Sequence, residues 1–129
     1  NMIISGGENI YPAEVEAVLA AHPAVQDVAV IGVPDPKWGE TVLAVVVLRG
    51  SVAPGETRAG RQAELEAWCR ERIAGFKRPR RYAFIDAARM PRTGTGKIQH
   101  RALRERLLAE WAGQGEPAQP TERGAAQTA

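Results

Sequence analysis

The chain has 129 residues, of which 44% are hydrophobic and 25% are charged, a composition typical of one small globular domain. Its longest purely apolar run, residues 42–48, is far shorter than the roughly 20 residues that a membrane-spanning helix needs. The only cysteine, Cys69, excludes an intrachain disulfide, argues against a cysteine-based metal site and fits the reducing cytoplasm. The first residues do not resemble a signal peptide and read as the start of a cut, longer chain.

The net charge of +2 conceals an uneven distribution. Residues 1–69 carry 4 basic and 9 acidic side chains, whereas residues 70–106 carry 12 basic and 3 acidic ones. Such a basic block attracts polyanions, which include nucleic acid, the phosphates of a nucleotide cofactor and anionic membranes. A solvated, arginine-rich helix face is the alternative interpretation.

The first predicted elements are two short strands within residues 2–11, joined by a turn at Gly6 and Gly7, since glycine permits positive φ. Pro12 is typical of a first helical position, and the helix that it opens should end before His22.

Two strands follow. Residues 25–33 are rich in β-branched side chains, and the prolines of residues 34–36 should end that strand. A turn that contains Trp38 leads to a nearly continuous apolar strand over residues 41–48, which we expect to be central and covered on both faces.

The second half alternates helices with short connections. We predict a helix over residues 61–73 closed by Gly75, a strand over 81–85, a loop over 91–97 and an amphipathic helix over 98–111. The order of elements predicts an α+β fold in which helices pack on a small antiparallel or mixed sheet.

The composition of the chain end predicts no packed structure. It contains mainly Gly, Pro, Gln, Glu, Thr and Ala from Gly113 onward. We therefore expect one domain over residues 1–111 and a disordered tail over residues 112–129.

The glycine-rich loop that ends in Lys97 is the sharpest candidate site. Glycines allow the backbone to approach a phosphate, and the lysine adds a compact positive charge. The segment is not a P-loop, because Pro91 and Ile98 occupy positions where that motif needs Gly and Ser or Thr. A plain turn with an exposed lysine is the alternative.

Two other segments have open interpretations. The turn at residues 5–9 either binds an anion through its amides or is simply a tight hairpin. Residues 76–82 interleave aromatic and cationic side chains, which suits a nucleotide cofactor as well as solvated charge. They lack any known nucleic-acid reader motif.

Four isolated aromatic or titratable side chains have simple structural interpretations. Trp38 either caps the core or stacks on a ligand, and core capping is the default. His22 and His100 lack metal-ligand spacing and are expected at the surface, whereas Cys69 is expected in the core.

Three separated segments, in this order, resemble the C-terminal domain of the adenylate-forming superfamily. They are MIISGGENIYPAEVE at residues 2–16, VIGVPDPKWGE at 30–40 and PRTGTGKI at 91–98. The superfamily contains acyl- and aryl-CoA synthetases, nonribosomal adenylation domains and luciferases. The resemblance covers residues 1–111 and is greatest to the CoA ligases of fatty or aromatic acids.

The resemblance implies a two-step ligase reaction in a larger chain. A carboxylic acid and ATP give an acyl-adenylate and pyrophosphate, and CoA then displaces AMP to form the thioester. The lysine that matches Lys97 serves the first step. After the domain swings to a second pose, the loop that matches Gly6, Gly7 and Glu8 lines the channel for the pantetheine arm of CoA.

The resemblance also gives the basic block a role. In CoA ligases, the positions of Trp38, Phe76, Arg78 and Arg80 lie where the CoA nucleotide docks, and the neighbouring Lys77 is placed to assist. The resemblance implies that the hinge residue precedes this chain. His100 departs from the family, which often has a pair of basic residues there.

The remaining machinery is expected elsewhere in the same enzyme. The ATP, magnesium and acid sites belong to an N-terminal adenylation domain, so this chain alone should be inactive. Two other functions remain open: the lid of a nonribosomal adenylation domain that serves a carrier protein, and a stand-alone nucleotide- or nucleic-acid-binding module. The three ordered motifs argue against the second.

Overall fold

The computed structural model describes residues 2–50 and 58–114. It contains three α-helices, two short 3-10 helices and five strands in these residues, in this order. The elements are β1 (Ile3–Ser5), β2 (Glu8–Ile10), α1 (Pro12–Ala20), β3 (Val25–Asp35), β4 (Gly39–Leu48), α2 (Arg58–Arg70), η1 (Gly75–Lys77), β5 (Arg81–Phe84), η2 (Ala87–Arg89) and α3 (His100–Gln114).

The strands form one mixed sheet that is organised around β4. Its antiparallel part has the order β2-β1-β4-β3, and β5 pairs with β4 in parallel. β3 pairs with β4 along its length, from Val25 opposite Leu48 to Asp35 opposite Gly39. β1 meets β4 only at Ser5 and Gly39, so the β1–β2 hairpin extends from one end of the sheet.

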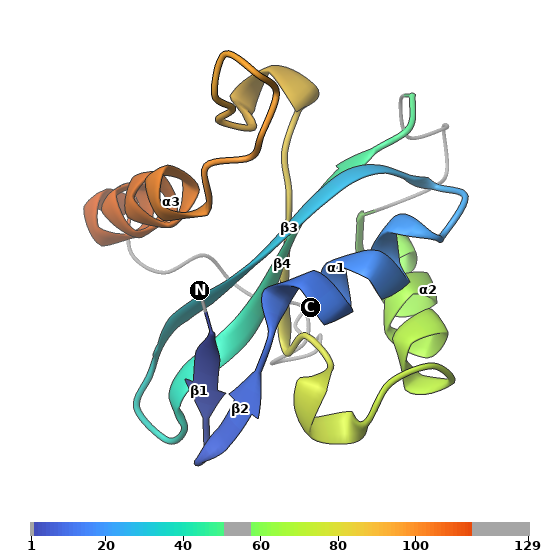
Figure 1. Cartoon of the computed structure of the whole chain (residues 1–129), viewed down its shortest axis with the longest axis vertical. Helices are drawn as coiled ribbons and strands as arrows, with labels where there is room; N and C mark the ends of the chain where they lie inside the picture. The colour runs from blue at the N-terminus through green and yellow to red at the C-terminus, as the bar shows by residue number, and fades with distance from the viewer. Residues whose placement is uncertain (1, 51–57, 115–129) are drawn as a thin grey trace.

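Helices cover both faces of this sheet (Figure 1). α1 and α2 lie on one face and α3 lies on the other, which confirms the predicted α+β class. Alternate residues of β4 therefore enter two different cores, as the two-residue period of a strand requires. Val42, Ala44 and Val46 point toward α1 and α2, and Leu43 and Val45 point toward α3.

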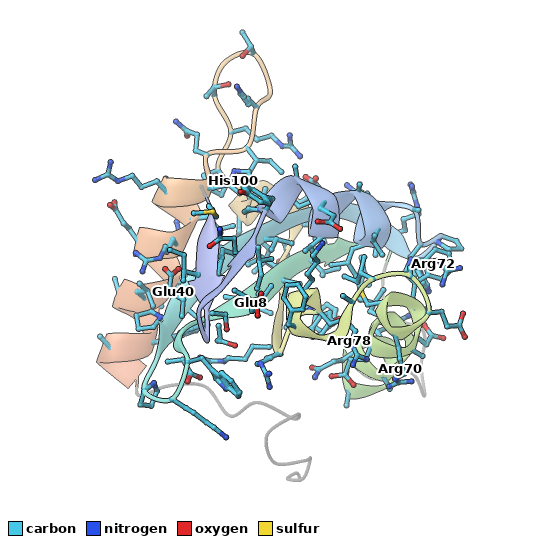
Figure 2. All side chains as sticks on the ribbon, turned by 60° about the horizontal axis from the view of Figure 1, so that its bottom comes forward. Glu8, Glu40, Arg70, Arg72, Arg78 and His100 are labelled. Carbon is cyan, nitrogen blue, oxygen red and sulfur yellow. The ribbon has the colours of Figure 1, made fainter. Side chains whose placement is uncertain are left out.

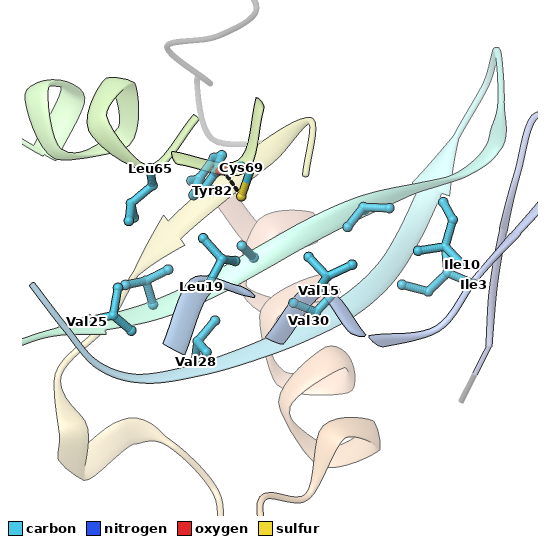
Figure 3. Close-up of a cluster of buried hydrophobic side chains, with 13 residues drawn as sticks. Ile3, Ile10, Val15, Leu19, Val25, Val28, Val30, Leu65, Cys69 and Tyr82 are labelled. Atoms are coloured by element: carbon cyan, nitrogen blue, oxygen red, sulfur yellow. Dashed lines mark hydrogen bonds between the residues drawn. The ribbon is translucent and has the colours of Figure 1, made fainter. Parts of the chain in front are cut away.

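The first core is the larger of the two and is shown in Figure 3. Val15 and Leu19 from α1 and Leu65 and Cys69 from α2 are completely or almost completely buried in it. The predicted core position of Cys69 is confirmed. Burial of a large aliphatic side chain contributes about 1.5–3 kcal/mol, so this layer fixes the two helices on the sheet.

Several predicted boundaries are wrong for identifiable reasons. β3 continues through Pro34 to Asp35, because β3 lies at the end of the strand order and proline can replace a strand residue whose N–H faces outward. α2 ends at Arg70, and Arg72 and Ile73 donate backbone hydrogen bonds to the Cys69 carbonyl just after it. Gly75 opens η1 and is not a helix cap.

The last helix is also displaced from its prediction. α3 begins at His100, because Ile98 is paired with Arg92 across the preceding loop. It extends to Gln114, so the predicted tail starts too early. The rest of that predicted tail, residues 115–129, lies outside the described residues.

Candidate functional site

The loop that carries Lys97 is a closed turn between η2 and α3. The Thr93 N–H donates to the Lys97 carbonyl at 2.8 Å, and the Lys97 N–H donates to Thr93 Oγ1 at 3.1 Å. Gly96 adopts φ +91°, which a residue with a side chain rarely does. The Lys97 side chain is exposed, and its ammonium has no hydrogen bond or ion pair with any described residue. The backbone is thus fixed and the ammonium is free.

Contacts at both ends connect this loop to the domain. Arg92 forms an ion pair with Asp27 of β3 and donates from Nη1 to the Gly96 carbonyl at 2.5 Å. At the other end, His100 contacts Glu16 of α1. Lys97, Arg92, His100 and Glu16 line an open cavity of about 770 Å³.

The glycine turn of the β1–β2 hairpin packs directly against Trp38. Gly6 and Gly7 have φ values of +58° and +84°, and the Gly6 N–H donates to the Trp38 carbonyl at 2.8 Å. A Cβ atom on Gly6 would lie only 2.7 Å from Cε3 of the Trp38 ring. Gly6 therefore leaves room for the indole, whereas Glu8 begins β2 and is exposed.

Cations surround the ring of Trp38. The Arg80 guanidinium carbon lies 4.5 Å from the ring centroid, and Lys37 Nζ lies 4.9 Å from it. Asp35 Oδ1 accepts hydrogen bonds from the backbone N–H groups of Lys37 and Trp38, which fixes the turn between β3 and β4. The structure thus joins Gly6, Trp38 and Arg80, which are distant in the sequence, in one surface cluster around the half-buried Trp38 ring.

The other predicted CoA residues lie on the connector η1 and just after it. Phe76 is 43% exposed, a large fraction for its ring. Lys77 Nζ binds both carboxylate oxygens of Glu14 at 3.0 Å, so its charge is shared with α1. The guanidinium of Arg78 packs over Gly75, and its Nε is buried with no hydrogen-bond partner among the described residues.

These connector residues do not contact the Trp38 cluster directly. Within the described part of the chain, no hydrogen bond, ion pair or ring contact links Phe76, Lys77 or Arg78 to Trp38. In Figure 2, Glu8 and Arg78 both lie away from the loop that rises beyond His100.

The basic segment of residues 76–82 is not one continuous edge. Its last two residues enter β5 and are buried, since Arg81 is 8% and Tyr82 is 4% exposed. Arg81 packs over the Trp111 ring at 4.6 Å, and Tyr82 Oη lies 4.0 Å from Cys69 Sγ. Burial raises the pKa of both Cys69 and Tyr82 above its ordinary value. Only the part before β5 can receive a ligand.

Both histidines, which were expected at the surface, are partly exposed and make specific contacts. His22 is half-buried edge-on to Trp68 at 4.8 Å, and its Nδ1 accepts the Ala24 N–H. Burial also lowers the pKa of His22. His100 Nε2 lies 2.6 Å from Glu16 Oε2. The contacts of His22 with Trp68 and of His100 with Glu16 join residues that are distant in the sequence, so no local pattern reveals them.

Sequence reasoning also missed a carboxylate beside the hairpin. Glu40 Oε1 accepts the backbone N–H of Ile4 at 3.0 Å, and its carboxylate carbon lies 3.1 Å from where a Cβ on Gly32 would be. Glu40 is the last residue of the second motif, VIGVPDPKWGE, and its place in that motif is the sequence signal that could have identified it. It fixes β1 where the sheet pairing with β4 stops.

The loop over residues 91–97 (the lysine loop) and the turn at Gly6 and Gly7 (the glycine turn) lie at opposite ends of the domain (Figure 1). The loop before α3 is at the top of that view and the β1–β2 turn is at the bottom. In the described ranges 2–50 and 58–114, no group of three or more His, Cys, Asp or Glu could hold a metal ion. Over the same ranges, no helix has the length and apolar character to cross a membrane.

A family model decides the kinship of this chain. The model of the AMP-binding enzyme C-terminal domain matches residues 14–97 and so ends on Lys97. The chain belongs to this family. The predicted resemblance to C-terminal domains of adenylate-forming enzymes is confirmed.

Curated relatives of this AMP-binding C-terminal domain are CoA ligases. It is 53% identical over 108 residues to a feruloyl-CoA synthase from an Amycolatopsis species, which covers 83% of the chain and 20% of that protein. It is 47% identical over 110 residues to a 4-chlorobenzoate–CoA ligase from a Pseudomonas species, which covers 84% of the chain and 19% of that protein. The chain thus spans about a fifth of the length of these relatives.

Solved structures agree with this kinship. A Mycobacterium tuberculosis fatty acyl CoA synthetase matches with a TM-score of 0.72 and 43% identity over 84% of the chain and 20% of that protein. An acyl-CoA synthetase from Brucella canis matches with a TM-score of 0.73 and 39% identity over 88% of the chain and 20% of that protein.

Proposed function

We propose that this chain is the mobile C-terminal domain of an ATP-dependent acid–CoA ligase that activates a fatty or aromatic acid. The observation that carries the proposal is the separation of the lysine loop and the glycine turn, which lie at opposite ends of one small domain. One active site cannot contact both ends at once. A domain that turns between two poses could present each end in a different half-reaction.

In the first half-reaction, a carboxylate oxygen of the acid attacks the α-phosphorus of ATP, and the bond to pyrophosphate breaks. The Lys97 ammonium binds the carboxylate and α-phosphate oxygens and stabilises the charge that develops between them. The support in this chain is a free ammonium on a fixed backbone loop. ATP, magnesium and acid are held by an N-terminal adenylation domain of the same enzyme.

In the second half-reaction, the thiol sulfur of CoA bonds to the acyl carbon, the bond to AMP breaks and the thiol proton is released. Gly6, Gly7 and Glu8 line the channel for the pantetheine arm, since glycines leave space beside the backbone. Trp38 and Arg80 form a stacked pair next to that turn, which suits the adenine and phosphates of CoA. Phe76, Lys77 and Arg78 supply a second part of the proposed CoA surface, on the connector before β5.

The CoA acceptor is favoured over a carrier protein by this Trp38–Arg80 pair and by the names of the relatives. The proposed location is the cytoplasm, because the single cysteine fits a reducing compartment.

The test uses the full-length enzyme with a panel of aromatic and fatty acids. We expect acid-dependent pyrophosphate release from ATP without CoA, and AMP plus a CoA thioester once CoA is added. Mass spectrometry identifies the thioester, and reactions without acid are the control. Adenylate formation that never yields a CoA thioester with any accepted acid would contradict the ligase and point to a carrier protein.

A further inference from the structure

A contact between His100 and Glu16 joins two helices at the base of the lysine loop. His100 is the first residue of α3 and follows Lys97 by only three positions in the sequence. Its Nε2 lies 2.6 Å from Oε2 of Glu16 in α1, and the side chains are 26% and 22% exposed. Figure 2 shows His100 where the loop meets the body of the domain. The end of the loop is therefore tied to α1.

Glu16 is itself held by the sheet. The same Oε2 atom accepts the backbone N–H of Val30 in β3 at 2.8 Å, and Val30 is completely buried. β3 lies at the end of the strand order, so this carboxylate serves a donor that no further strand satisfies. A continuous set of hydrogen bonds thus runs from β3 through Glu16 to His100.

This connection complements the ion pair at the other end of the loop. Arg92 is bound to Asp27, close to the start of β3, and to the Gly96 carbonyl. The loop is anchored on both sides, whereas the Lys97 ammonium remains free of protein partners in the described residues. Such anchoring holds a charged group in place without competing for its charge.

We propose that Glu16 and His100 are positioning residues for Lys97, which hold the end of its loop on α1 and β3 so that the ammonium reaches the adenylation site. The inference rests on the proposed role of Lys97 and assigns two residues to its support. The assigned role acts through the loop that carries Lys97, although both residues also line the cavity beside it. A displacement of about 1 Å in such a group costs about 100-fold in rate, so loss of the contact should be measurable.

The experiment measures both half-reactions in the full-length enzyme. We expect His100→Ala and Glu16→Ala each to slow adenylate formation by about 10- to 100-fold while thioester formation from supplied adenylate is unchanged. The double variant should be no slower than Glu16→Ala alone, because Glu16→Ala already removes the one contact that His100→Ala removes. His100→Gln should restore much of the rate, since its amide nitrogen can donate from near the Nε2 position. His100→Asn, which is shorter, should not.

The other histidine supplies the matched control. His22 is also half-buried and has its own polar and ring contacts, but these lie on Ala24 and Trp68 and not at the loop. His22→Ala should leave the ratio of the two half-reactions unchanged. Equal losses in both half-reactions for the His100 and Glu16 variants, or normal adenylation in them, would overturn the inference.

Lys97→Ala separates this inference from the proposal on which it rests. If Lys97→Ala abolishes adenylation and the His100 and Glu16 variants are normal, only the positioning role fails. If Lys97→Ala itself leaves adenylation intact, the proposed function of the loop fails.

Discussion

The lysine loop and the glycine turn differ in what they present at the surface of the domain. The loop holds its backbone through polar contacts at both ends and leaves one long cationic side chain free. The turn has almost no side chain of its own, and Gly6 allows the Trp38 ring to approach within contact distance. The lysine loop presents a positively charged side chain to solvent, whereas the glycine turn leaves space beside its backbone. This difference favours separate roles at the two ends of the domain over one shared site.

The largest effect is expected for the loop. Lys97→Ala removes the only free ammonium that the loop presents, and we expect adenylate formation to fall by about 100- to 1,000-fold or more. Thioester formation from supplied adenylate should persist. Pyrophosphate exchange and a single-turnover thioester assay in the full-length enzyme measure the two. Lys97→Arg is the control for charge alone, and equal losses in both steps would show that the two regions share one site.

The next effect concerns the turn. Gly6→Ala puts a Cβ against Trp38 at a positive φ, and overpacking of this kind costs about 1–3 kcal/mol. We therefore expect the thioester step to slow by about tenfold or more, with adenylation unchanged. Gly39→Ala is the matched control, because Gly39 has φ +85° but no atom within 4 Å of its added Cβ. If both variants behave alike, backbone strain and not the Trp38 contact is responsible.

A smaller effect should come from the cations beside the turn. Arg80→Ala removes the guanidinium over Trp38, and the loss of a cation–π and phosphate contact of about 1–2 kcal/mol should raise the KM for CoA about five- to thirtyfold. Initial rates at varied CoA concentration measure this change.

Arg72→Ala is the control for that measurement, since Arg72 stacks on Trp68 at 3.4 Å on another part of the surface. A KM for CoA that does not respond to Arg80→Ala, or that rises equally in both variants, would remove Arg80 from the proposed CoA surface.

The smallest effect on activity is expected for a change in the core that contains Cys69 and Tyr82, where the measurable effect is on stability. Because Cys69 and Tyr82 have raised pKa values, the folded state holds their protons more tightly than the unfolded state does. Their stabilising contribution is complete below the ordinary pKa of 9.0 for cysteine and is lost as the pH rises above it. Urea unfolding on either side of that pH should show the loss, and it should be smaller in Tyr82→Phe. A change in either half-reaction in Tyr82→Phe would contradict the separation of core and site.

Much of the framework could be predicted because it depends on local patterns. The apolar run in β4 indicated burial on both faces, and the paired glycines at residues 6 and 7 indicated a turn. Cys69 was predicted in the core from helical spacing and lies there. These features depend on a few neighbouring residues, which the sequence displays directly.

The contacts that build the site could not be predicted in this way. Gly6 meets Trp38 and Glu16 meets His100 only after the sheet brings distant segments together. The alternating pattern of aromatic and basic residues also gave no sign that Tyr82 turns into the core, since that depends on the pairing of β5 with β4. Helix ends shifted for the same reason, because backbone bonds after Cys69 end α2 well before Gly75.

The most direct test compares Lys97→Ala and Gly6→Ala in one full-length enzyme, with adenylate formation and thioester formation from supplied adenylate measured side by side. We predict a crossed result, in which Lys97→Ala loses only the first step and Gly6→Ala loses only the second. If both variants lose the same step, the two ends of the domain do not serve separate half-reactions.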